Sequence, residues 1–173
     1  PRLGSRVLNL LDDMSNWGNP KYVLGEVDVF KIEPDHELYA HMNVNYLRLE
    51  KIPRFEDGWQ PVVDALRGGQ FFVTTGEVLI PEFTVNGRQS GELAAVRKNG
   101  EVEVRVDLQW TFPLSYAEII TGDGDNIKRL RIDLSATESF GKKSFKFNVN
   151  ASQARWLRIE VWDIATNGAF TQP

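Results

Sequence analysis

The spacing of apolar residues along the chain changes near residue 69. Before it the signals are helical and irregular, whereas after it apolar side chains recur at every second position to the end of the sequence. A repeat of about 3.6 residues is typical of a helix, and a repeat of two is typical of a strand with one buried face. The chain is therefore expected to consist of a helix-rich segment, residues 1–68, followed by a β-rich domain, residues 69–173.

Three elements are predicted in the first segment. Residues 36–50 follow an Asp-containing cap and carry apolar side chains at helical spacing, which predicts a helix that ends before Pro53. A second helix is predicted over residues 59–67, with Gly68 and Gly69 as its stop. Residues 27–32 have the crowded apolar pattern of a short buried strand.

The alternation after residue 69 is clearest at residues 102–110, where apolar side chains at even positions alternate with polar ones at odd positions. Similar runs cover residues 129–134, 145–149 and 157–161, and residues 71–73 start a buried strand. Turn-forming residues separate the runs at Asn86-Gly87, Asn99-Gly100, 122–125 and Gly141. About seven or eight strands with one apolar face each bury those faces by packing two sheets together or by closing a barrel. The expected fold class is mainly β (α+β): an antiparallel β-sandwich with an N-terminal helical segment.

Composition narrows the functional classes. The 173 residues carry a net charge of −4, which argues against a general nucleic-acid binder because phosphate binding needs clustered cations. The chain has no cysteine, so it has neither a disulfide nor a thiolate metal site. No apolar run approaches the ~20 residues of a membrane span. Pro1 is not followed by a signal-peptide pattern, and we interpret this to mean that none existed or that the front has been removed.

Metal binding is not predicted within this chain, and neither is a cofactor. His36 and His41 are five residues apart, so on one helix they would point about 140° away from each other. Residues 122–126 offer carboxylate and amide oxygens of the kind that calcium prefers, but they lack the later bidentate Glu of an EF-hand loop. A hairpin turn is the preferred interpretation of these five residues.

No catalytic residue is predicted either. Thr74, Thr75 and Glu77 are polar, but both histidines lie some thirty or more residues upstream, and nothing in the sequence joins them into a triad. The preferred interpretation of Thr74-Thr75-Gly76 is a joint between the two parts of the chain, in which the hydroxyls bond backbone groups.

Four residues near the C-terminus form the candidate binding surface: Trp156, Arg158, Glu160 and Trp162. If Leu157, Ile159 and Val161 face the core, these four must share the opposite face of the strand. Two interpretations stay open. The face is covered by the N-terminal segment or by a neighbouring domain, or the two indoles form a carbohydrate-stacking platform on which the charged residues bond hydroxyls.

Two stretches resemble a known family. Residues 59–76, WQPVVDALRGGQFFVTTG, and the ending made of 156–163, WLRIEVWD, and 167–173, NGAFTQP, are similar to the C-terminal part of secreted metallohydrolase-like proteins of the polymerase-and-histidinol-phosphatase (PHP) superfamily. The resemblance implies a passage from a metal-binding α/β domain into a β-rich C-terminal domain, with residues 1–68 as a remnant of or connection to the former. It also implies a secreted or periplasmic location.

The active-site motifs of that family do not carry over, because neither the His-x-His nor the Gly-x-Asp-x-His pattern occurs here. The leading hypothesis is therefore a non-catalytic accessory domain that stabilises or orients a PHP-like hydrolase domain, the chain's own N-terminal domain if the chain is a fragment. The alternatives are a carbohydrate-binding module that uses the Trp pair and a divergent metal-dependent phosphoesterase.

Overall fold

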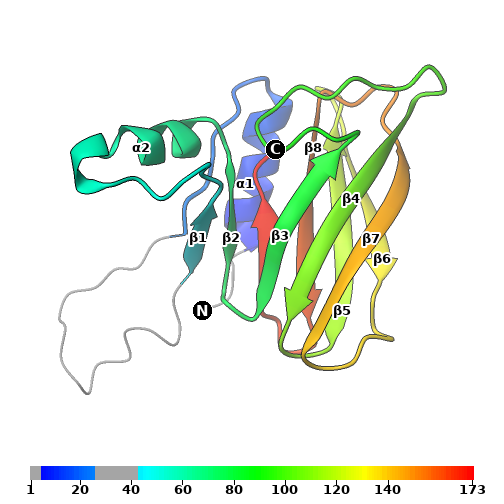
Figure 1. Ribbon diagram of the computed structural model, residues 1–173. Coiled ribbons are helices and arrows are strands. Elements are labelled where there is room, and N and C mark those ends of the chain that lie inside the picture. Colours follow the sequence, from blue (N-terminus) through cyan, green and yellow to red (C-terminus); the bar gives the residue numbers. More distant parts are fainter. Residues whose placement is uncertain (1–4, 26–42) are drawn as a thin grey trace.

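Two antiparallel β-sheets pack against each other in the computed structural model, which describes residues 5–25 and 43–173 (Figure 1). The predicted mainly β (α+β) class is confirmed. The helices are α1 (Ser5–Asn16), the 3-10 helix η1 (Phe55–Asp57) and α2 (Gln60–Arg67). The strands are β1 (Val44–Leu47), β2 (Phe71–Thr74), β3 (Val78–Val85), β4 (Glu101–Trp110), β5 (Leu114–Gly122), β6 (Ile127–Asp133), β7 (Gly141–Asn150), β8 (Trp156–Asp163) and β9 (Gly168–Thr171).

The two sheets differ in width. One has six strands in the order β1-β2-β9-β8-β5-β6, and the other has three in the order β3-β4-β7. Strand β3, an edge of the narrow sheet, lies closest to β9 of the wide one. Strands β1 and β2 therefore extend past the narrow sheet, and α2 and η1 project beyond them as a lobe (Figure 1).

The core lies between the two sheets and follows from the alternation in the sequence. The even-numbered side chains of β4, from Val102 to Trp110, are buried, and so are Ile119, Ile159 and Val161 of the facing sheet. Burying one apolar face of each strand stabilises the fold by about 25 cal/mol for each Å² of apolar area removed from water. The predicted inward direction of Ile159 and Val161 is confirmed.

Part of the outer face of the wide sheet is buried as well, because α1 packs on it. Leu8 and Leu11 of the helix contact Phe71, Val73 and Phe170 of β2 and β9 in a second apolar cluster. Strand β9 is consequently buried along its whole length. Within the described ranges, no helix has the length and apolar character that a membrane-spanning helix needs.

The joint at Thr74-Thr75-Gly76 carries the chain from the wide sheet into the narrow one. The Thr74 hydroxyl donates to the Val78 carbonyl and accepts the Gly76 N–H at 2.9 Å. Thr75 and Gly168 bond reciprocally, since the Thr75 N–H donates to the Gly168 carbonyl at 3.0 Å and the Gly168 N–H donates to the Thr75 hydroxyl at 3.1 Å. The prediction that these hydroxyls bond backbone groups is confirmed.

The predicted helix over residues 36–50 is wrong where the structure describes it. Residues 44–47 form β1, which pairs with β2 in register from Val44↔Thr74 to Leu47↔Phe71. The Tyr46 ring stacks on Phe72 with centroids 5.1 Å apart. Tertiary pairing with a neighbouring strand here overrides the helical spacing of the apolar residues.

The helix predicted over residues 59–67 is confirmed as α2. The strand predicted over residues 27–32 lies outside the described residues, as do His36 and His41. Both α1 and β1 precede residue 69, yet both pack on the wide sheet, so this sheet includes residues from each side of the predicted division.

Replacing Thr74 by valine should lower the free energy of unfolding by about 1–3 kcal/mol, because the change leaves buried backbone partners at the corner without a hydrogen bond. Urea denaturation of both proteins measures the difference. The matched control is Thr84→Val near the far end of β3, away from the corner, for which we expect a change within about 0.5 kcal/mol. Equal effects at both positions would show that the corner hydroxyl has no special role.

Candidate functional site

The four residues predicted to share the outer face of β8 do so, but the structure does not leave them together on an open surface. Helix α1 crosses the middle of this face and covers Arg158, whose side chain is 0% exposed. Glu160 is buried beside it, whereas Trp156 and Trp162 are half-buried at the two ends of the strand.

A bidentate ion pair fixes α1 on this face. The Arg158 Nε donates to Asp12 Oδ1 at 2.6 Å, and Nη2 donates to Asp12 Oδ2 at 3.0 Å. Asp12 is 1% exposed, so both partners have left water. A buried charge needs such a partner, because the unpaired ion would pay its whole desolvation penalty. Arg158 is thus committed to the helix and is closed off from any surface ligand.

A second guanidinium, Arg129 of β6, extends the pair into a network. Its Nη1 donates to Glu118 at 2.9 Å and to Glu160 at 3.1 Å, while Nη2 donates to Asp12. Glu118 and Glu160 are direct partners across β5 and β8, an arrangement in which like charges repel. Arg129 offsets that repulsion by bonding both carboxylates.

The network contains three carboxylates and two guanidinium groups, and this excess of carboxylates affects the pKa of Glu160. Burial raises the pKa of Glu160, and the attraction of Arg158 and Arg129 only partly opposes the effect. Its Oε2 lies 3.6 Å from Arg158 Nη1, and neither atom has a hydrogen-bond partner among the described residues. The charged form of Glu160 is thus disfavoured where it sits.

Both tryptophans of β8 lie over a glycine of the neighbouring strand. A methyl group added to Gly168 would come within 2.6 Å of the Trp162 ring, and one added to Gly122 would come within 2.2 Å of the Trp156 Nε1. Each glycine is the direct cross-strand partner of its tryptophan. The absence of a side chain on these two residues lets the indoles approach the sheet backbone closely.

The two indoles open into different pockets. Trp162 lines a pocket of about 390 Å³ beside the N-terminal half of α1, together with Tyr116 and Glu160. Trp156 lines another, of about 380 Å³, beside Asn16 at the end of the helix. The covered ion network separates the pockets, so the structure does not bring the two indoles into one platform.

Sequence reasoning missed the partners of the candidate residues, namely Asp12, Glu118, Arg129 and Tyr116. Tyr116 is the direct cross-strand neighbour of Trp162, and the Arg131 guanidinium lies 3.5 Å from the centre of its ring. Burial raises the pKa of the Tyr116 hydroxyl above its ordinary value. The alternation within β5 and β6 indicates which residues share a face, but only the strand order identifies which of them meet.

The loop at residues 122–126 is the hairpin turn between β5 and β6. The Asp123 Oδ1 accepts the backbone N–H groups of Asp125 and Asn126, at 2.9 and 2.7 Å. These bonds lower the pKa of Asp123, Asn126 contributing most. Within residues 5–25 and 43–173, no group of three or more His, Cys, Asp or Glu side chains is placed to hold a metal ion.

Comparisons of the chain with protein-family models, with curated proteins and with solved structures find no significant match.

Replacing Asp12 by alanine should lower the free energy of unfolding by about 3–5 kcal/mol, because it leaves the Arg158 guanidinium buried without its main partner. The measurement is guanidinium chloride denaturation followed by tryptophan fluorescence. Asp13→Ala removes the same charge from the next position of α1 and is the control, with an expected loss under about 1 kcal/mol. Similar losses for both variants would contradict the assigned role of Asp12.

The raised pKa of Glu160 gives a pH dependence of defined sign. The folded protein holds this proton more tightly than the unfolded chain, so this carboxyl adds stability as the pH falls through its folded pKa toward the ordinary value of 4.5. Relative to Glu160→Gln, the native protein should therefore gain stability as the pH falls from neutral into this window. Urea denaturation of both proteins over a pH series measures the difference, and a flat or opposite trend would refute the assignment.

Proposed function

We propose that this chain serves as a non-catalytic accessory domain that docks on a PHP-like, metal-dependent hydrolase domain and stabilises or orients it. The observation that carries the proposal is the concentration of exposed apolar side chains on the projecting lobe made of residues 44–67, which we call the docking lobe. The motif resemblance of residues 59–76 supports the choice of an α/β hydrolase domain as its partner.

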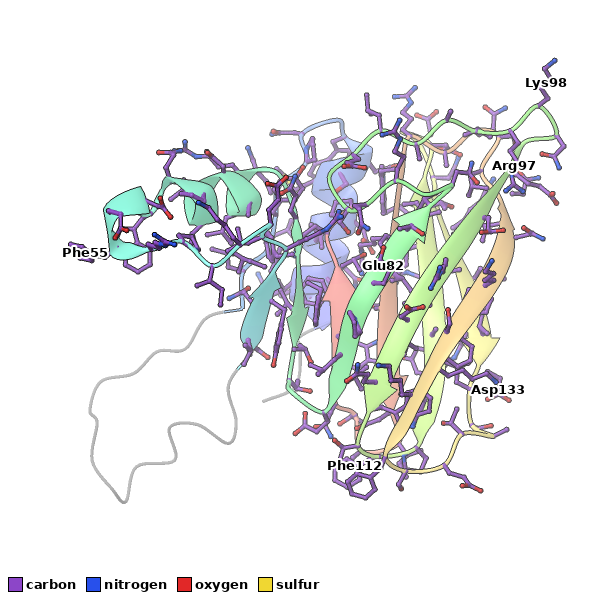
Figure 2. All side chains as sticks on the ribbon, in the orientation of Figure 1. Phe55, Glu82, Arg97, Lys98, Phe112 and Asp133 are labelled. Atoms are coloured by element: carbon purple, nitrogen blue, oxygen red, sulfur yellow. The ribbon has the colours of Figure 1, made fainter. Side chains whose placement is uncertain are left out.

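The docking lobe exposes large apolar side chains at the positions most distant from the sandwich. Phe55 is fully exposed at 101%, Ile52 at 88% and Trp59 at 80%. Figure 2 shows Phe55 at the outer tip of the lobe. Contiguous apolar surfaces are uncommon on folded monomers and mark interaction sites when they occur. Burial of these side chains against a partner would remove their apolar surface from water, which is favourable.

Helix α2 has few buried residues for an amphipathic helix. Of its eight residues only Ala65 is buried, and Val62, Val63 and Leu66 are partly exposed. A short helix gains most of its stability from packing one face against a neighbour. The partly exposed apolar residues of α2 therefore support the proposal that a partner packs beside the docking lobe.

An apolar groove joins the docking lobe to the sandwich. A pocket of about 340 Å³ lies where β1 and β2 extend past β3, with Tyr46, Phe72, Ile80 and Phe83 among its lining residues. Tyr46 is 45% exposed although its ring stacks on Phe72. The groove and the docking lobe together offer a partner several exposed aromatic side chains, the residue types enriched at interface centres.

Hydrolysis is assigned to the partner in this proposal. Thr74 and Thr75, the polar residues of the joint, bond backbone groups. The carboxylates of Asp12, Glu118 and Glu160 are paired with Arg129 or Arg158. The chain's contribution is then the stability and orientation of the hydrolase domain, which a shared apolar interface supplies.

The test uses the PHP-like domain encoded in the same reading frame or operon as this chain. The complex should form, and Phe55→Ser with Trp59→Ser should weaken it at least about tenfold, because the pair supplies two of the anchors. Isothermal titration calorimetry measures the affinity, and the melting temperature of the hydrolase domain with and without the chain measures the stabilisation.

Phe140→Ser is the matched control, since Phe140 is 84% exposed but lies in the connection between β6 and β7, the edge strands of the two sheets farthest in strand order from β1 and β3. It should leave the affinity within about twofold. The proposal fails if no PHP-like domain is encoded with this chain, if the two do not associate, or if the double variant binds as well as the native protein.

A further inference from the structure

The pocket beside Trp162 has the size and lining of a small-ligand site. Its volume of about 390 Å³ falls in the lower part of the usual range of roughly 300–1,000 Å³ for such sites. It lies between α1 and the strands β5, β6 and β8. The pocket is separate from the docking lobe, because none of its lining residues belongs to residues 44–67.

Trp162 supplies an aromatic surface to this pocket. One side of its indole lies against the backbone at Gly168, so the remaining exposed part of the ring faces away from the sheet into the pocket. Tyr116 stands next to it as the cross-strand partner, but the Arg131 guanidinium covers the Tyr116 ring. The tyrosine therefore offers its hydroxyl and the tryptophan offers its ring.

Three neutral polar residues line the pocket in addition to the charged Arg129, Glu160 and Asp163. Asn9 of α1, Ser115 of β5 and Thr166 of the turn after β8 all line the pocket. An amide and two hydroxyls provide both donors and acceptors. A flat ring beside several neutral hydrogen-bonding groups suits a ligand that has an apolar face and many hydroxyls.

The charges beside the pocket disfavour an anion. The Arg129 guanidinium, which lines the pocket, already donates to Glu118, Glu160 and Asp12. The residues that line the pocket include two carboxyl groups, Glu160 and Asp163, and one guanidinium, Arg129, so bringing another negative charge near them costs energy. Phosphates and acidic sugars are therefore poor candidates, and neutral sugars remain.

We propose that this pocket binds one neutral sugar ring, which stacks on Trp162 and is hydrogen-bonded by Asn9, Ser115, Thr166 and Tyr116. The site differs from the two-tryptophan platform considered for the sequence. Trp156 opens into the other pocket and Arg158 is buried under α1, so neither takes part. The proposal does not depend on the hydrolase partner.

The experiment is a titration of the isotope-labelled chain with neutral hexasaccharides of glucose, xylose, mannose and N-acetylglucosamine, followed in nitrogen–proton NMR spectra. Each of the five tryptophans gives its own indole N–H signal, and Trp→Phe variants assign them. At about 10 mM sugar, at least one hexasaccharide should shift the Trp162 signal, with a Kd in the millimolar range or below.

Two controls sharpen the result. Trp156→Phe should keep the affinity within about twofold, because its indole lies in the other pocket, whereas Trp162→Ala should lower it at least about tenfold. The galacturonate hexamer, which carries a carboxylate on every ring, should bind at least about tenfold more weakly than the best neutral sugar. The assignment uses the phenylalanine variants, so it stands even if Trp162→Ala does not fold.

The proposal is overturned if no neutral hexasaccharide shifts the Trp162 signal at that concentration. A shift confined to Trp156 would also overturn it, and so would tighter binding of the galacturonate hexamer. A folded Trp162→Ala protein that binds the sugar unchanged would have the same consequence.

Discussion

The buried ion pair between Asp12 and Arg158 determines what the outer face of the wide sheet offers to other molecules. An Arg at this position would be costly on an apolar face or under a helix without an acid. Because Asp12 pairs with Arg158, α1 can cover the middle of this face and is held there in one defined position. Replacing such a pair with apolar residues is often neutral for stability, so its main effect here is the placement of the helix.

That placement separates the molecule into surfaces with different properties. The middle of the outer face is occupied by the network of Asp12, Arg158, Arg129, Glu118 and Glu160. One indole opens at each end of the covered region, in a pocket of its own. The large exposed apolar surface considered for docking lies elsewhere, on the lobe where the wide sheet extends past the narrow one.

Much of the fold could be predicted from the sequence because alternation is a local signal. The strand at residues 102–110 and the helix at 59–67 needed no knowledge of their neighbours, and both are confirmed as β4 and α2. The strand at 44–47 was missed because its partner, β2, lies more than twenty residues away and decides its conformation. The role of Thr74 could be interpreted correctly because its bonds run to Gly76 and Val78 in the same turn, whereas the partner of Thr75, Gly168, is 93 residues away.

The candidate site was predictable only in part. Alternation placed Trp156, Arg158, Glu160 and Trp162 on one face, but it could not show that Asp12, 146 residues away, covers Arg158. Nor could it pair Tyr116 with Trp162, because strand register is a property of the sheet and not of one strand. The two indoles looked like one platform in the sequence, and the helix between them makes two separate sites.

Native-state hydrogen exchange of the chain tests the anchoring of α1 most directly, because it reports the opening free energy of each element separately. We expect the amides of α1 to exchange with an opening free energy close to that of β8, since the buried pair joins the two, while the docking lobe exchanges much faster. If α1 instead exchanges as fast as the docking lobe, with β8 still protected, the ion pair does not hold the helix on the sheet and the account is wrong.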